Sequence, residues 1–147
     1  MNALLEALSV ETPEPSNAVE NARSARILVV EDEVELRELT TAALTHEGYE
    51  VDFAENGVRA WKALHLRRYD LLVTDNKMPK MTGLQLVQKL RSAGIELPVV
   101  LASASLPGET PRNEAMLRFA AVVPKPFTLD ELVGTVRGVL RGLAYPT

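Results

Sequence analysis

The stretch Leu71-Leu72-Val73-Thr74-Asp75-Asn76-Lys77-Met78-Pro79 decides the fold of this chain. Its first three residues form an apolar run that is too short for a helix and is typical of a strand covered on both faces. Pro79 then prevents the strand from continuing, because proline has no backbone N–H for the ladder. The pattern predicts a buried strand that ends on Asp75, at the edge where open parallel sheets bind ligands. Since a lone Asp after a strand often only caps a turn, its role depends on its neighbours.

Four more short apolar runs predict the remaining strands, and segments of helical periodicity separate them. The strands are expected at 27–30, 49–54, 99–102 and 121–123. The strand at 49–54 alternates apolar and polar residues, which predicts a position nearer the edge of the sheet. Strand and helix alternate five times, which predicts an α/β fold with a doubly wound five-stranded parallel sheet and helices on both faces.

Helix boundaries are marked by capping residues. Gly48 suits the position after a helix that buries Leu36, Leu39 and Ala43. A second helix follows Asn56, and Thr82 can cap a third, which Gly94 closes. The remaining signals predict a final helix from Leu129 to about Arg141, with a Thr128–Glu131 capping box and an apolar stripe of Leu132, Val133, Val136, Val139 and Leu140. Prolines allow only a short helix between 106 and 118, starting no earlier than Pro111.

Length and composition favour one domain in a cytoplasmic protein. The chain has 147 residues, no cysteine, and no apolar run long enough to cross a bilayer. Its net charge of −4 does not favour nucleic-acid binding. Residues 1–25 are proline-containing and acidic, and we expect a flexible extension there, followed by a domain at 26–142 and a tail at 143–147. Leu4, Leu5 and Leu8 have the spacing of a short amphipathic helix, which would need a partner surface to be stable.

Five polar residues stand at strand ends and should meet at one edge of the sheet: Glu31, Asp32, Asp75, Ser103 and Lys125. Three gathered carboxylates repel by roughly 4 kcal/mol per close pair, so the cluster calls for a cation. Oxygen ligands favour a hard ion, and Mg²⁺ fits best because it binds through few carboxylates plus a phosphate. Asp75 is then a candidate nucleophile toward a phosphoryl group, with Lys125 and Ser103 stabilising its oxygens.

At this point the chain resembles the receiver domains of two-component response regulators. The matching pieces, in the family's order, are Ile-Leu-Val-Val-Glu-Asp-Glu at 27–33, Asp-Leu-Leu-Val-Thr-Asp at 70–75 with Met-Pro after it, Pro-Val-Val-Leu-Ala-Ser-Ala at 98–104, and Pro-Lys-Pro-Phe at 124–127. The resemblance covers residues 26 to about 142 and implies the flavodoxin-like strand order 2-1-3-4-5.

The resemblance also implies roles for individual residues. Asp75 would accept phosphate from a histidine kinase or phosphotransfer protein, and Ser103 and Lys125 would respond to it. Glu31, Asp32, Asp75 and the Lys77 carbonyl would hold Mg²⁺. The Lys125–Pro126 bond is expected to be cis, a geometry almost confined to proline.

Three departures shape what we expect of signalling. Val122 stands where the family commonly has an aromatic switch residue, and prolines break the stretch that corresponds to the family's fourth helix. We also expect no output domain after the final helix, and therefore a stand-alone receiver that signals to a downstream protein, with a homodimer as a further option. A receiver cut from a longer chain would have the same sequence features.

Two other functions stay open. A Mg²⁺-dependent phosphohydrolase would need an acid two residues after its nucleophile, where this chain has Lys77. A non-phosphorylated binding module would not need all five site residues. His46 and His65 are expected to be ordinary surface histidines and Trp61 a packing residue.

Overall fold

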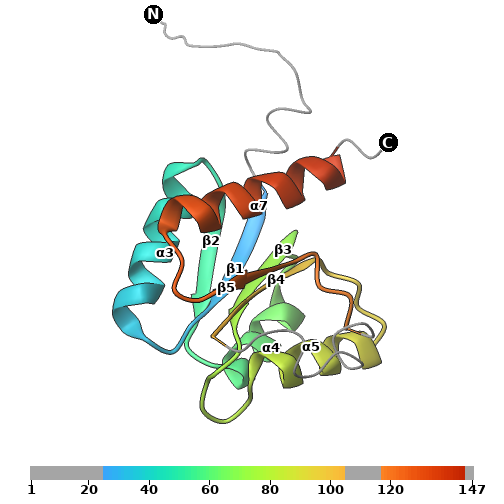
Figure 1. Cartoon of the computed structure of the whole chain (residues 1–147). Helices are drawn as coiled ribbons and strands as arrows, with labels where there is room; N and C mark the ends of the chain where they lie inside the picture. The colour runs from blue at the N-terminus through green and yellow to red at the C-terminus, as the bar shows by residue number, and fades with distance from the viewer. Residues whose placement is uncertain (1–24, 105–116, 145–147) are drawn as a thin grey trace, which may run out of the picture.

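The computed structural model describes residues 25–104 and 117–144. Five parallel strands form one sheet in the order β2-β1-β3-β4-β5 (Figure 1). They are β1 (Arg26–Val30), β2 (Glu50–Ala54), β3 (Leu71–Asp75), β4 (Val99–Ser103) and β5 (Ala121–Pro124). The doubly wound fold and its strand order are therefore as predicted, and β2 is an edge strand.

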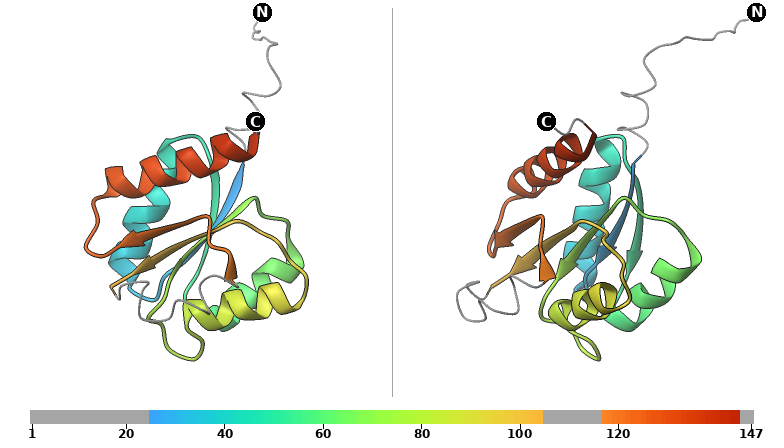
Figure 2. Two further views of the ribbon diagram at one scale, coloured as in Figure 1. Left: turned by 45° about the vertical axis from the view of Figure 1, so that its right-hand side comes forward. Right: turned by 90° about the vertical axis from the view of Figure 1, so that its right-hand side faces the viewer.

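Helices cover both faces of the sheet (Figure 2). On one face lie α3 (Val34–His46) and α7 (Leu129–Ala144), and on the other lie α4 (Gly57–Leu66) and α5 (Gly83–Ser92). Because successive strand residues point to opposite faces, β1 sends Ile27 and Val29 to the apolar cluster under α3 and α7. Leu28 and Val30 enter the cluster under α4 and α5.

The central strands β3 and β4 are buried at every position. Burying one Leu or Val side chain contributes about 1.5–3 kcal/mol, so these strands hold much of the stabilising apolar area. Asp75 and Ser103, the last residues of the two strands, share that burial although they are polar. The core thus fixes the position of the two side chains that end it.

The predicted caps are present. Asn56 accepts a hydrogen bond from the Arg59 amide at the start of α4. Thr82 begins α5 with a capping box, and Thr128 and Glu131 exchange the two bonds expected at the start of α7. Gly48 and Gly94 follow α3 and α5 at φ +101° and +80°, the left-handed region that glycine adopts without strain.

The prediction was wrong in several details, and the ends of β1, β4 and β5 also differ from it by one residue. Leu39 is 49% exposed, because the inward face of α3 runs through Thr40 and Leu44, with Leu36 and Ala43 at its margin. The final helix continues to Ala144, about one turn beyond the predicted end. The strand expected at 49–54 starts at Glu50.

Four predictions lie wholly or largely outside the described residues: the flexible extension at 1–25, the amphipathic spacing of Leu4, Leu5 and Leu8, the proline-interrupted segment at 106–118, and the tail at 143–147. Within the described ranges, no helix has the length and hydropathy that a membrane span requires.

Candidate functional site

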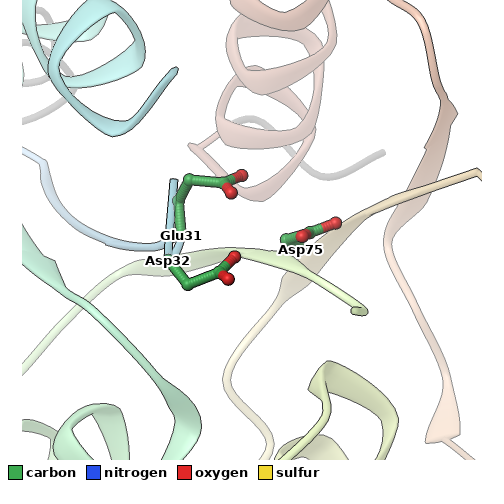
Figure 3. Close-up of side chains that lie close together, drawn as sticks. All are labelled: Glu31, Asp32 and Asp75. Atoms are coloured by element: carbon green, nitrogen blue, oxygen red, sulfur yellow. The ribbon is translucent and has the colours of Figure 1, made fainter. Parts of the chain in front are cut away.

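Three carboxylates gather at the carboxyl edge of the sheet. Asp75 ends β3, and Glu31 and Asp32 directly follow the neighbouring strand β1. One oxygen from each lies within 4.8 Å of the others, and Figure 3 shows the three side chains directed toward a common space. Glu31 and Asp75 are buried and Asp32 is exposed, so the cluster is open to solvent on one side.

Lys125 brings a positive charge to these acids. Its Nζ lies 3.0 Å from Asp75 Oδ1 and 3.9 Å from Glu31 Oε1. The Lys125 amide donates to the Ser103 carbonyl at 2.9 Å, which joins the ends of β4 and β5 and sets the lysine beside the acids. The Lys125–Pro126 peptide is cis, as expected from the resemblance.

Burial and the closeness of charged groups shift the pKa values of Glu31 and Lys125. Burial raises the pKa of Glu31 to about 7, and the negative charges of Asp75 and Asp32 add to the effect, while the Glu33 amide and Lys125 oppose it. Burial tends to lower the pKa of Lys125, but its hydrogen bond to Asp75 and the nearby carboxylates outweigh that and raise it. The site therefore holds more negative charge than Lys125 can balance.

This donor set suits a hard divalent cation. All three side chains offer carboxylate oxygens, and the described residues bring no histidine into the group. A cation placed among them would relieve the carboxylate repulsion that adds to the effect of burial in raising the pKa of Glu31. The residues present therefore fit the Mg²⁺ site predicted from the sequence.

Several contacts that hold Asp75 in place were missed in the sequence. Thr74 is fully buried and its hydroxyl donates to the Asp75 carbonyl at 2.8 Å. The Asn76 side chain accepts from the Leu84 amide at 3.0 Å, which ties the loop after β3 to α5. A Cβ at Gly83 would overlap the Asp75 carbonyl oxygen, so only glycine allows α5 to start this close. The capping role of Thr82 was the available sequence signal for this junction.

Arg37 was also missed. Its guanidinium donates to the Glu31 carbonyl at 3.2 Å and lies over the ring of Phe53, 4.9 Å from the centroid. Phe53 is 56% exposed on the edge strand β2. The pair links the acidic turn after β1 to the neighbouring strand, and nothing in the local sequence pattern indicates it.

The other candidate residues are placed as follows. Lys77 is exposed two residues beyond β3, and Ser103 is buried at the end of β4. His46 and His65 are exposed, with His65 Nδ1 2.8 Å from the Trp61 carbonyl oxygen. Trp61 is partly buried against the cluster under α4 and α5, which confirms it as a packing residue.

Comparisons with known proteins agree with this geometry. A family model described as the response regulator receiver domain matches residues 27–137. The response regulator MprA of Mycobacterium ulcerans is 37% identical over 125 residues, which are 80% of this chain and 51% of that protein. MprA of Mycobacterium tuberculosis is 36% identical with the same coverage. The chain thus spans about half the length of these curated relatives.

Solved structures show the same similarity. The response regulator TrrA of Thermotoga maritima, solved in complex with Mg²⁺-BeF, is 35% identical with a TM-score of 0.70, covering 78% of this chain and 98% of that one. The chemotaxis protein CheY4 of Vibrio cholerae is 26% identical with a TM-score of 0.73, covering 79% and 98%. A Francisella receiver domain, 24% identical over 82% and 99% of the two chains with a TM-score of 0.76, matches in fold.

Proposed function

The chain belongs to the response-regulator receiver family, and from this premise we propose that it accepts a phosphoryl group on Asp75 from a histidine kinase or phosphotransfer protein. The observation that carries the proposal is the 3.0 Å pair between Asp75 and Lys125 beside two further carboxylates. A carboxylate oxygen attacks the phosphorus, the bond to the donor nitrogen breaks, and the donor leaves with its electron pair.

The residues around Asp75 have complementary roles in this transfer. Lys125 is within reach of Asp75 and can neutralise one oxygen of the arriving phosphoryl group as a point charge. Ser103, at the end of the adjacent strand, can donate its hydroxyl to a second oxygen. Because Ser103 ends β4 and Lys125 directly follows β5 of the same sheet, both residues are positioned before the donor arrives.

We assign Mg²⁺ to Glu31, Asp32 and Asp75, with the Lys77 carbonyl as the further ligand that the family resemblance implies. When bound, Mg²⁺ would neutralise charge on the phosphoryl oxygens. Burial and the neighbouring carboxylates favour the protonated form of Glu31, and a bound Mg²⁺ would favour its ionised form instead.

The domain acts as a phosphorylated signal carrier rather than a turnover enzyme. Lys77 occupies the position two residues after Asp75, where a phosphohydrolase would hold an acid for general acid–base work. The signal would pass to a downstream protein in the cytoplasm by direct contact, with a homodimer as a further option. Since the chain spans about half of its curated relatives, the output of the whole protein is part of this proposal.

Phosphorylation on Asp75 can be tested with a small-molecule donor. We expect wild-type protein incubated with acetyl phosphate and Mg²⁺ to gain the mass of one phosphoryl group, and Asp75→Asn to gain none. Intact-protein mass spectrometry measures both. The acyl phosphate should also disappear on treatment with hydroxylamine. A mass gain that persists in Asp75→Asn contradicts the assignment.

A further inference from the structure

A groove beside α7 is lined by three glycines, and no contact in the described structure explains why glycine stands at these positions. It encloses about 450 Å³ between α7 and the amino-terminal ends of β4 and β5. Its α7 side carries Gly134, Gly138 and Gly142, four residues apart on one face, and its other lining residues include Ala121 and Val139. We call this surface the α7 groove.

The three glycines lower the stability of α7, and no packing contact within the described residues offsets this cost. Each glycine in a helix interior costs about 0.5–1 kcal/mol relative to alanine. A Cβ built on any of the three would meet no atom of the described chain within 4 Å, so internal packing does not require glycine there. A face without side chains lets another backbone approach closely, as small residues do where helices pack tightly. The groove is shaped for an apolar segment.

This chain contains such a segment outside the described residues. Met1, Leu4, Leu5 and Leu8 have the i, i+3, i+4, i+7 spacing of one helical face. Within residues 1–10, Glu6 is the one charged side chain. A helix this short is marginal alone and needs a surface to cover its apolar face.

The chain enters the fold at the same edge as the groove. Ala25 is buried just before β1 and belongs to the same apolar cluster as Val136 and Leu140 of α7. Since all strands are parallel, the start of β1 and the starts of β4 and β5 lie along one edge of the sheet. At about 4.8 Å per strand, β4 and β5 are about 10 and 14 Å from β1.

The intervening chain has a suitable length for this span. Sixteen residues, 9 to 24, separate the apolar segment from Ala25, and any flexible linker of that length has a root-mean-square reach of about 20–24 Å. A tether that matches the distance gives an effective concentration in the millimolar range, so a weak contact is enough to fill the groove. Exposed Arg141, one turn beyond Gly138 on α7, offers an opposite charge to Glu6.

A second groove is a poorer match. It has a volume of about 650 Å³ between α4 and α5, and the polar side chains of Gln85, Gln88 and Lys89 stand beside Trp61 and Met81 in its lining. It also lies on the opposite face of the sheet from α7 (Figure 2). Leucine side chains gain less there, because the polar groups would lose water without new partners.

We propose that residues 1–10 form a short amphipathic helix that docks its Met1, Leu4, Leu5 and Leu8 face into the α7 groove of the same chain. The docked segment covers a surface of α7 at the edge opposite the acidic cluster. It therefore leaves Asp75 accessible, and any protein that binds this part of α7 has to displace it. The proposal does not depend on phosphorylation.

A spin label can test the docking in the full-length protein. The chain has no cysteine, so Asn2→Cys provides a single attachment site. We expect the label to broaden the amide signals of Gly134, Gly138 and Gly142 at least twofold relative to the reduced label. Adding Leu4→Asp and Leu8→Asp should restore these signals, whereas Val19→Asp, the matched control outside the apolar face, should leave the broadening in place.

Three results would overturn the proposal. They are no broadening at the glycines, broadening centred on Trp61 in the other groove, and broadening that persists with Leu4→Asp and Leu8→Asp. A mixture of labelled and isotope-enriched unlabelled chains distinguishes cis from trans docking, and broadening in that mixture would assign the groove to a second copy instead.

A helix-stability comparison provides an independent readout. Gly138→Ala should raise the melting temperature more in the Leu4→Asp, Leu8→Asp background than in the wild type, because the added methyl group intrudes on the docked segment. Equal shifts in both backgrounds would contradict docking over Gly138.

Discussion

Asp75 is fixed by its immediate neighbours more than by its own side chain. Thr74 and Gly83 contact its carbonyl, and Lys125 pairs with its carboxylate. The remaining charge of the site comes from Glu31 and Asp32, which share one strand end. At the residue scale, the site is a buried carboxylate with one positive partner and two negative ones. The stability of the folded protein should therefore respond strongly to divalent cations.

We predict that Mg²⁺ stabilises the wild type and that Asp32→Asn weakens this effect. A ligand at 100 times its dissociation constant stabilises a fold by about 2.7 kcal/mol, and each tenfold loss of affinity removes about 1.4 kcal/mol. Asp32 is the exposed member of the acidic cluster, so its substitution changes packing little. Thermal unfolding with and without MgCl₂ measures the difference.

The matched control for Asp32 is Glu96→Gln, an exposed acid before β4 at the other edge of the sheet. It should keep the full Mg²⁺-induced shift in melting temperature. If Asp32→Asn and Glu96→Gln respond to Mg²⁺ alike, the acidic cluster is not the binding site.

At the element scale, Arg91 connects α5 to two other segments. Its guanidinium donates to the carbonyls of Ile95 and Leu97, in the loop that enters β4, at 2.9 and 2.8 Å. It also donates to the carbonyls of Leu117 and Arg118 at 2.8 and 3.3 Å. One planar group thus satisfies four backbone acceptors from two loops. An ammonium group does not have the geometry to replace it.

We predict that Arg91→Lys lowers the free energy of unfolding by about 1–3 kcal/mol, because three partly buried carbonyls and one exposed carbonyl lose charged donors. Urea denaturation measures the loss. Arg68→Lys, at an exposed position after α4, is the control and should change stability by less than about 0.5 kcal/mol. If Arg91→Lys is equally mild, the four bonds contribute no net stability.

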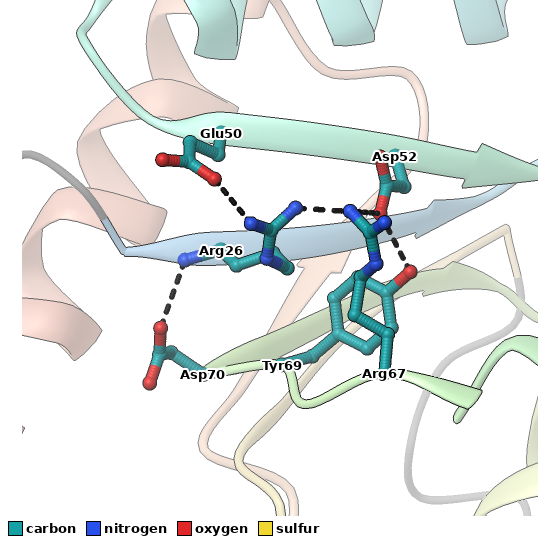
Figure 4. Close-up of polar contacts among 6 residues, drawn as sticks. All are labelled: Arg26, Glu50, Asp52, Arg67, Tyr69 and Asp70. Carbon is teal, nitrogen blue, oxygen red and sulfur yellow. Dashed lines mark hydrogen bonds and ion pairs between the residues drawn. The ribbon is translucent and has the colours of Figure 1, made fainter. Parts of the chain in front are cut away.

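A second connection joins β1, β2 and the turn before β3 (Figure 4). The Tyr69 hydroxyl donates to Asp52 Oδ2 at 2.7 Å, and Arg26 and Arg67 lie 3.7 and 3.6 Å from the same carboxylate. The Arg26 amide also donates to Asp70 at 2.8 Å. Burial, followed by the hydrogen bond to Asp52, raises the pKa of Tyr69 to about 12.

The raised pKa of Tyr69 determines whether its contribution to stability rises or falls at alkaline pH. The unfolded chain loses the Tyr69 proton near pH 10, whereas the folded chain retains it to about pH 12, so the folded state binds more protons between these values. We therefore predict that the phenol's contribution to stability is present below pH 10 and is lost as pH rises to 12. Tyr69→Phe should lose less stability over that range. Parallel slopes in denaturation midpoints for the two proteins would contradict this.

At the scale of the whole molecule, the fold and the acidic cluster were predictable for the same reason. Short apolar runs that alternate with helical periodicity specify a parallel sheet, and a parallel sheet brings all strand ends to one edge. Glu31, Asp32 and Asp75 could therefore be grouped before any distance was known. Their roles in phosphorylation rest on the family and on the proposal above.

What could not be predicted depends on contacts between distant residues. Arg91 and Leu117 are 26 residues apart, and Tyr69 and Asp52 are 17 apart, and neither pair has a local pattern. Leu39 was misplaced for a different reason. An apolar stripe can be drawn through Leu36, Leu39 and Ala43, and the burial of polar Thr40, which moves the face, has no hydrophobic signal.

The exposed Leu39 matters for how a kinase would reach Asp75. A phosphodonor protein has to bring its phosphohistidine to the carboxyl edge of the sheet, so it must contact the elements that start there. α3 begins directly beyond the acidic cluster, and it leaves Val34 54% and Leu39 49% exposed. Exposed apolar surface on an element that begins beside a site is where a protein partner can be contacted.

We predict that Leu39→Asp slows phosphotransfer at least tenfold when the donor is a histidine kinase that labels the wild type. A tenfold loss corresponds to about 1.4 kcal/mol of lost contact energy. Labelling by acetyl phosphate should stay within twofold of the wild type, because a small donor does not need the surface of α3. Leu66→Asp is the control, since Leu66 is 85% exposed but ends α4 at the other edge of the sheet. Radiolabel transfer in single-turnover conditions measures the rates. If Leu39→Asp slows both donors equally, or if Leu66→Asp slows the kinase as much, α3 is not the docking surface.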